Sequence, residues 1–184
     1  MQFVIELWKP ILLGGFGVFV MSALAWTVLP HHRKEWRKLI SEDAVAEALR
    51  AGAPTPGLYN IPHMDFKEMG SPEGKAKMDR GPVAYITIVK SGTPPMGPAM
   101  AKSFLWCVLV AFFVAYVCWH ALPMGSDFRE VFRLAGAMTF SVFALGNVGD
   151  SIWFGRPWSS WTLQLVDAVM YMIVLGGIFG WLWP

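Results

Sequence analysis

Four apolar stretches dominate the hydrophobic pattern of this chain, and they cover residues 11–29, 103–119, 134–149 and 158–183. The first contains no charged residue, and its length is close to the ~20 apolar residues that a helix needs to cross a bilayer. The third has an uncharged core of only sixteen residues, so it requires flanking residues at both ends to span the hydrocarbon region. The pattern predicts a multi-pass membrane protein with four transmembrane helices.

The first apolar stretch has to be distinguished from a cleaved signal peptide. Lys9 precedes it and small residues lie around Ala23, which loosely matches the charged, apolar and small-residue regions of a signal. However, Glu6 balances Lys9, and the apolar run continues through Trp26 to Leu29 beyond the supposed cleavage point. These features favour a transmembrane helix.

The polar positions gather in residues 31–102, between the first and second apolar stretches. Acidic residues after Ser41 predict the start of a short helix, and Ser71 predicts the start of another because a proline follows it. Residues 57–62 and 83–89 have the β-branched and aromatic content of short strands. We therefore expect a small α/β unit rather than an unstructured linker.

These elements define the predicted fold class, a membrane all-α protein with four transmembrane helices and a small α/β cap inserted between helices 1 and 2. The predicted boundaries are 1–30 for helix 1, 31–102 for the cap and 103–184 for helices 2–4. Residues 91–98 are rich in proline and glycine, which predicts a turn-rich tether between the cap and helix 2.

The composition agrees with a membrane protein, since 55% of the residues are hydrophobic and 15% are charged. The net charge of +2 is small and most charges lie in the polar segment, so no basic surface suited to nucleic acid is expected. Cys107 and Cys118 lie eleven positions apart on one predicted helix. That separation is roughly 16 Å along the helix axis, too far for a disulfide.

Lysine and arginine residues near the helix ends predict the orientation. Seven lie on the side of the polar segment and three on the opposite side. The seven are Arg33, Lys34, Arg37, Lys38, Lys90, Lys102 and Arg156, and the three are Lys9, Arg129 and Arg133. Because basic residues favour the cytoplasmic side of a membrane, we expect residues 31–102 in the cytoplasm and both termini outside.

Five polar residues form a candidate cluster on the side of the polar segment, namely Asp150, Arg156, Asp167, His31 and His32. Asp167 lies inside the fourth apolar stretch, where an ionised carboxylate costs ~2.5 to 3.5 kcal/mol on insertion scales, so it requires a partner, a proton or water. One hypothesis makes it part of an ion or substrate path, with the histidines as a proton or metal station. The other hypothesis has Arg156 pair with Asp167 or Asp150 and lock the hairpin of helices 3 and 4. The absence of charges in helices 1 and 2 favours the second.

The histidines do not define a metal or haem site by their spacing. His31 and His32 are adjacent, without the i, i+4 spacing that makes a metal site specific. His120 ends the second stretch on the opposite side, so it cannot pair with them around a haem. We therefore predict no metal and no cofactor, and interpret His31 and His32 as interfacial residues beside a basic cluster.

No catalytic residue is predicted, because the sequence contains none of the common nucleophile, metalloprotease or phosphate-binding motifs. Its glycines indicate close helix packing instead. Gly176 and Gly180 form a small-xxx-small pair in the fourth stretch, and Gly14, Gly15 and Gly17 give the first stretch a thin face. Such faces suit contacts either within the protein or with a partner.

Several segments carry a resemblance to a known family. They are Pro30-His31-His32 with Trp36, residues 57–62, residues 152–158 and the ending 179–184. In these segments the chain resembles a family of uncharacterised bacterial four-helix inner-membrane proteins. The resemblance implies a bacterial inner membrane, and it implies no activity, cofactor or site residue.

The function expected from the sequence is that of a non-catalytic accessory or scaffolding subunit of a larger membrane complex. Its partners would be the lipid bilayer and other membrane subunits or further copies of the chain, with no nucleic acid. An alternative is a small transporter or ion-coupling membrane protein that uses Asp167. A third interpretation is a membrane enzyme with an interfacial site.

Overall fold

The computed structural model describes residues 2–184 and divides the chain into two compact units. One unit contains the residues up to Arg37 together with Pro95–Pro184, and the other contains Lys38–Pro94. The larger unit is helical, and the smaller one holds a two-stranded sheet with short helices. This confirms the predicted fold class, with a small unit inserted between the first and second membrane-spanning helices.

Four segments of the larger unit, among the described residues 2–184, are long and apolar enough to cross a membrane. The four are α1 (Gln2–Thr27), α5 (Met96–Ala121), the segment Phe128–Trp153 and α8 (Trp158–Leu182). The segment Phe128–Trp153 consists of α6 (Phe128–Phe140), the π-helix η1 (Ser141–Leu145) and α7 (Val148–Trp153). The chain is thus a multi-pass membrane protein with four candidate spans.

Two of the helices, α1 and α5, are longer than the apolar stretches that predicted them. Helix α1 begins at Gln2, and its first turns run through Lys9 and Pro10. Helix α5 begins at Met96, so the predicted tether is helical from that residue onward. Pro98 is compatible with this start because the first turn of a helix leaves its amide groups unbonded in any case.

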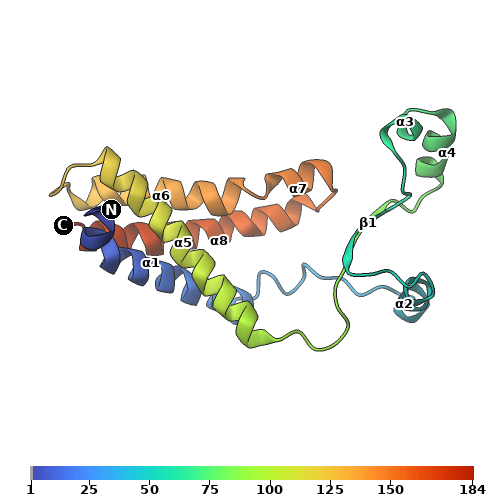
Figure 1. The fold of residues 1–184 in the computed structure, drawn as a ribbon, viewed down its shortest axis with the longest axis horizontal. Coiled ribbons are helices and arrows are strands. Elements are labelled where there is room, and N and C mark those ends of the chain that lie inside the picture. The colour runs from blue at the N-terminus through green and yellow to red at the C-terminus, as the bar shows by residue number, and fades with distance from the viewer. Residues whose placement is uncertain (1) are drawn as a thin grey trace. The chain divides into compact units, whose positions relative to one another are not determined.

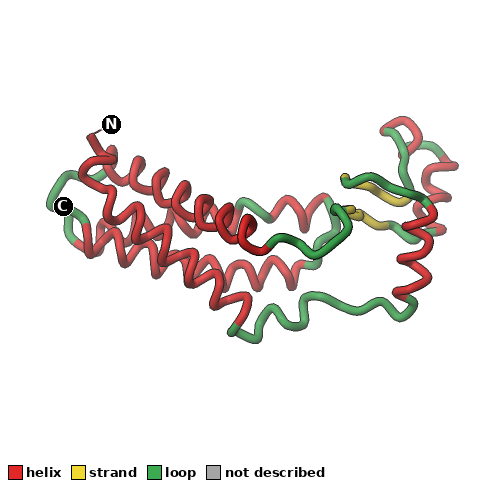
Figure 2. The backbone as a smooth tube through the Cα atoms, turned by 60° about the horizontal axis from the view of Figure 1, so that its bottom comes forward, coloured by secondary structure: helices red, strands yellow, loops and turns green. Residues whose placement is uncertain are grey.

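Helices α1, α5, α6 and α8 form a bundle in which α8 packs against both α1 and α6, and α1 packs against α5 (Figure 1). The N- and C-terminal ends lie at one end of this bundle (Figures 1 and 2), and α7 lies at the other (Figure 1). The fully buried side chains of its core include Leu7, Val18, Val114, Leu175 and Phe179. The bundle therefore buries one face of each helix and leaves the other faces to the lipid.

Glycine allows the closest helix approaches. A Cβ atom added at Gly15 would lie 2.7 Å from the Cα of Val108, so α1 and α5 are in backbone contact there. On α8, a Cβ at Gly176 would lie 3.1 Å from the carbonyl oxygen of Phe132. One at Gly180 would lie 2.8 Å from the ring of Phe128. The Gly176 and Gly180 face is thus covered by α6 of the same chain.

The π-helix in the third span is held by a neighbouring tryptophan. The indole Nε1 of Trp161 donates a hydrogen bond to the carbonyl oxygen of Ala144 at 3.0 Å. Two residues after α7, a tight turn at Gly155, with φ of 66°, leads into α8. Arg156 follows that turn directly, and its backbone amide bonds the carbonyl oxygen of Asp150. The turn thus fixes the position of Arg156 at this end of the bundle.

The smaller unit pairs two antiparallel strands. Strand β1 (Gly57–Ile61) lies against β2 (Ala84–Ile88), with Tyr59 opposite Ile86. The helices of this unit are α2 (Glu42–Ala51), α3 (Phe66–Met69) and α4 (Pro72–Arg80). The hydroxyl of Ser71 caps α4 by accepting a hydrogen bond from Gly74, which explains why the serine and proline there predicted a helix start.

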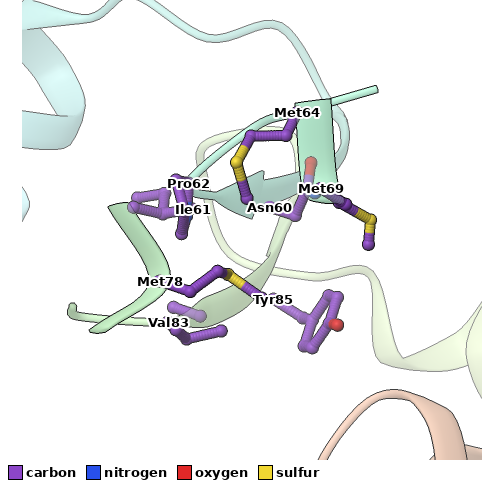
Figure 3. A pocket seen from close by; sticks show the side chains of 9 residues that line it. Asn60, Ile61, Pro62, Met64, Met69, Met78, Val83 and Tyr85 are labelled. Atoms are coloured by element: carbon purple, nitrogen blue, oxygen red, sulfur yellow. The ribbon is translucent and has the colours of Figure 1, made fainter. Parts of the chain in front are cut away.

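A small pocket in this unit is lined mainly by apolar side chains, among them Met64, Met69 and Met78 (Figure 3). Its volume is about 30 Å³. A cavity of that size holds water but no organic ligand. The pocket belongs to the packing of the small unit, and the candidate chemistry lies elsewhere.

Candidate functional site

The candidate site forms where the chain leaves α1 and turns back towards α8. Helix α1 ends at Thr27, and the following turns are closed by backbone hydrogen bonds from Arg33 to Pro30 and from Glu35 to His32. Asp167 faces this segment from the interior of α8, nine residues after its first residue, Trp158. That separation corresponds to roughly 14 Å along the helix axis. The turn therefore delivers its side chains to a carboxylate inside a membrane-spanning helix.

Both histidines of the turn contact Asp167. The Nε2 atom of His31 lies 2.7 Å from Oδ1 of Asp167, and the Nε2 atom of His32 lies 2.9 Å from Oδ2. Asp167 and His32 are 4% and 5% exposed, whereas the side chain of His31 is 19% exposed. Ligand atoms from the three residues all lie within 4.8 Å of one another. We call His31, His32 and Asp167 the His-Asp-His cluster.

Glu35 extends the cluster outwards. Its Oε2 atom lies 2.7 Å from Nδ1 of His32, and its Oε1 atom accepts a hydrogen bond from Arg156 at 3.3 Å. The Nη1 atom of Arg156 lies 3.9 Å from the carboxylate of Asp150, which is half exposed. The ionisable side chains thus run without a break from the buried cluster to the surface of the bundle.

Two pKa values of the turn are shifted, in opposite directions. For His32, burial acts most strongly and would lower the pKa, but hydrogen bonds and charges from Asp167 and Glu35 together raise it. For Glu35, burial would raise the pKa, but hydrogen bonds from His32, Ser160 and Arg156 lower it. Both shifts favour the charged form of the group concerned, because His32 lies beside two carboxylates and Glu35 lies beside His32 and Arg156.

Aromatic and hydroxyl groups surround the cluster. The indole of Trp26 stacks on the imidazole of His32, with ring centroids 3.9 Å apart and an angle of 4° between the rings. One turn further along α8, Tyr171 shares a hydrogen bond with Ser22 of α1. Trp26 therefore shields one face of the ring, and polar groups continue from Asp167 towards the middle of the bundle.

All five residues of the predicted cluster lie in this one network, but with different partners from those expected. Asp167 contacts His31 and His32, and Arg156 contacts Glu35 and Asp150 instead of Asp167. The reason is that the turn after α1 folds inward, so the imidazoles reach the carboxylate while Arg156 remains at the outer end. The histidines are accordingly turned into the bundle rather than towards the lipid head groups.

Sequence reasoning missed Glu35, which links the buried cluster to Arg156. It is the one acidic residue in a basic segment, residues 31–38. The available signal was its spacing, since a residue three positions after His32 lies on the same side of a helical turn. The role of Trp26 was also missed, because a tryptophan near the end of a membrane helix is expected at the lipid interface.

Comparison with known proteins gives no match, since no family model fits the chain and no curated protein or solved structure is similar to it. The class is therefore defined by the fold and the site alone. The chain is a four-span membrane protein with a histidine and carboxylate network at one end of its bundle. The resemblance to an uncharacterised bacterial family stays a prediction.

Proposed function

We propose that this protein is an ion-coupling or transport protein of the membrane that binds a cation at the His-Asp-His cluster. The observation that carries this proposal is the position of Asp167, which is 4% exposed within a membrane-spanning helix and contacts two imidazoles. Ionisable residues inside membrane spans are costly and typically mark ion or substrate pathways. This is the alternative that the sequence offered, and the geometry now favours it.

The partners of Asp167 are imidazoles, and this supports a binding role over a structural one. A lysine or arginine beside the carboxylate would be a permanent counter-ion and would leave no room for a second positive charge. Imidazole is neutral in one of its forms, and it then offers a lone pair to an incoming cation. The cluster thus combines one carboxylate with two such ligands at hydrogen-bond distance.

The three side chains of the cluster differ in their exposure to solvent, which suits a pathway that leads inward from the surface. His31 is the most exposed of the three side chains and lies towards the turn after α1. On the inner side, Tyr171 and Ser22 continue the polar groups into the bundle. An ion that enters past His31 would therefore meet Asp167 first and these hydroxyl groups next.

The scaffolding hypothesis has lost part of its physical argument. It relied on the Gly176 and Gly180 face as a possible contact surface, and α6 of the same chain covers that face. Scaffolding and an interfacial enzyme activity stay alternatives. For the location, we propose a bacterial inner membrane with residues 31–102 in the cytoplasm, supported by the basic residues on that side.

The proposed function is tested by cation flux into liposomes that contain the purified protein. Proton entry is followed with an internal pH dye, and Zn²⁺ entry with an internal fluorescent chelator. We expect the wild type to carry at least one of these cations faster than empty liposomes do. Asp167→Asn should reduce the flux to the level of empty liposomes, because it removes the negative charge of the cluster.

The matched control is Asp127→Asn. Asp127 caps α6 at the opposite end of the bundle by accepting hydrogen bonds from Arg129 and Glu130, and asparagine caps a helix equally well. This variant should retain the wild-type flux. Wild-type flux equal to that of empty liposomes, or an Asp167→Asn variant as active as the wild type, would refute the proposed function.

A further inference from the structure

We infer that the His-Asp-His cluster is a binding site for a divalent transition-metal ion of the zinc class, with His31, His32 and Asp167 as ligands and Glu35 as the group that orients His32. The inference deepens the proposed function and rests on it, because it names the cation.

The converging atoms are of the right kind and nearly at the right distance. Each histidine presents Nε2 to a different oxygen of Asp167, at 2.7 and 2.9 Å. Ligands of a tetrahedral zinc ion at about 2.1 Å lie roughly 3.4 Å apart, so each nitrogen would have to move about 0.5 to 0.7 Å away from its carboxylate oxygen to seat the ion. Such a movement lies within the freedom of side chains on a turn.

Glu35 fixes which nitrogen of His32 is available. Its carboxylate lies 2.7 Å from Nδ1, so that nitrogen is the donor and Nε2 faces Asp167. A neutral His32 would then place a lone pair opposite a carboxylate oxygen, and that contact requires a positive charge between the two atoms. A carboxylate that holds the far nitrogen of a histidine is the usual outer shell of a metal-bound imidazole.

The charges of the network balance with a divalent ion. With both imidazoles in the neutral form that binds a metal, Asp167, Glu35 and Asp150 contribute three negative charges, and Arg156 contributes one positive charge next to Glu35 and Asp150. A divalent cation at the cluster brings the positive charges to three. Because two of the three carboxylates are almost fully buried, an excess negative charge there would be costly.

The ligand set also selects the metal. Two imidazole nitrogens and one carboxylate suit Zn²⁺, Co²⁺ or Fe²⁺. Calcium and magnesium prefer oxygen ligands alone, and Cu⁺ prefers sulfur. Cys107 and Cys118 lie elsewhere, buried in α5. Three protein ligands leave one position open, as in sites where metal or substrate exchanges.

The test is Co²⁺ and Zn²⁺ binding to the full chain, purified in mild detergent without a histidine tag and treated with a chelator. We expect stoichiometric Co²⁺ binding with visible absorption bands of nitrogen and oxygen ligation, and we expect Zn²⁺ to displace it. His32→Gln and Asp167→Asn should each abolish the bands. Glu35→Gln keeps the three ligands but weakens the hydrogen bond to Nδ1 of His32. It should therefore lower Co²⁺ affinity by about 10-fold to 100-fold.

The matched control is His120→Gln. His120 lies at the other end of α5, is exposed, and contacts the carbonyl oxygen of Tyr116 through Nδ1. This variant should bind Co²⁺ as the wild type does. If His32→Gln fails to fold, the Co²⁺ affinity of Glu35→Gln still tests the inference, because this variant keeps all three ligands. Size-exclusion chromatography checks that Glu35→Gln is folded. Absence of the bands in the wild type, or their persistence in Asp167→Asn, would overturn the inference.

The outcome separates this inference from the proposed function. If the wild type binds no Co²⁺ or Zn²⁺ but its liposomes carry protons in a way that requires Asp167, the metal inference fails and the ion-coupling function stands. If the metal binds with the expected ligands but no cation crosses the membrane, the metal site stands and transport fails.

Discussion

Replacing His32 with leucine should lower the stability of the folded bundle by about 3 kcal/mol, the effect of removing one partner from a buried ion pair. His32 lies between Asp167 and Glu35, at 2.9 and 2.7 Å, and is 5% exposed. Its loss leaves Asp167 with His31 alone and Glu35 with Arg156 as its charged partner. Unfolding in detergent by increasing SDS, followed by tryptophan fluorescence, measures the change.

Two further variants show whether that loss comes from the buried charges. His120→Leu changes an exposed histidine at the opposite end of the bundle and should alter stability little. Adding His32→Leu to Asp167→Leu should cost clearly less than adding it to the wild type, because the main negative partner is already absent. Equal losses in the two backgrounds would show that His32 and Asp167 act independently.

Replacing Gly15 with alanine should destabilise the protein by about 1 to 3 kcal/mol, the range for overpacking a close contact. The new Cβ atom would lie 2.7 Å from Cα and 2.9 Å from the backbone nitrogen of Val108. Backbone atoms cannot rotate away as a side chain does, so α1 and α5 would have to separate. The same SDS titration measures this change.

Gly177→Ala is the matched control on α8. Within the described part of the chain, no atom outside its own surroundings lies within 4 Å of a Cβ added there. Alanine is the better helix former, so this variant should be neutral or slightly stabilising. If Gly15→Ala proves as mild as Gly177→Ala, the close crossing of α1 and α5 is not present in solution.

The four spans and the small sheet could be predicted because their signals are local. A segment such as residues 11–29 must be apolar along its whole length to cross a membrane, and that requirement is visible without knowledge of its neighbours. Strand β2 was visible through its β-branched and aromatic residues, and α4 through Ser71 and Pro72. The start of α1 at Gln2 was not visible, since Lys9 and Pro10 interrupt the apolar pattern there.

Five members of the candidate site could be predicted, but Glu35 and the pairing of the residues could not. Asp167 was conspicuous because a carboxylate inside a membrane helix needs a partner. Its partners lie 135 and 136 positions away in the chain, and nothing local distinguishes them from Arg156, which is much nearer in sequence. The inward fold of the turn after α1 decides the pairing, and it depends on packing against α8.

The most direct test of the His-Asp-His cluster is nitrogen NMR of the histidine side chains in protein labelled at histidine. The protein has four histidines, so each ring can be assigned by substitution. We predict that Asp167→Asn shifts the ring nitrogen signals of His31 and His32 and leaves those of His63 and His120 unchanged. Unchanged signals for His31 and His32 would contradict the account, because the two imidazoles would then not contact the carboxylate of Asp167.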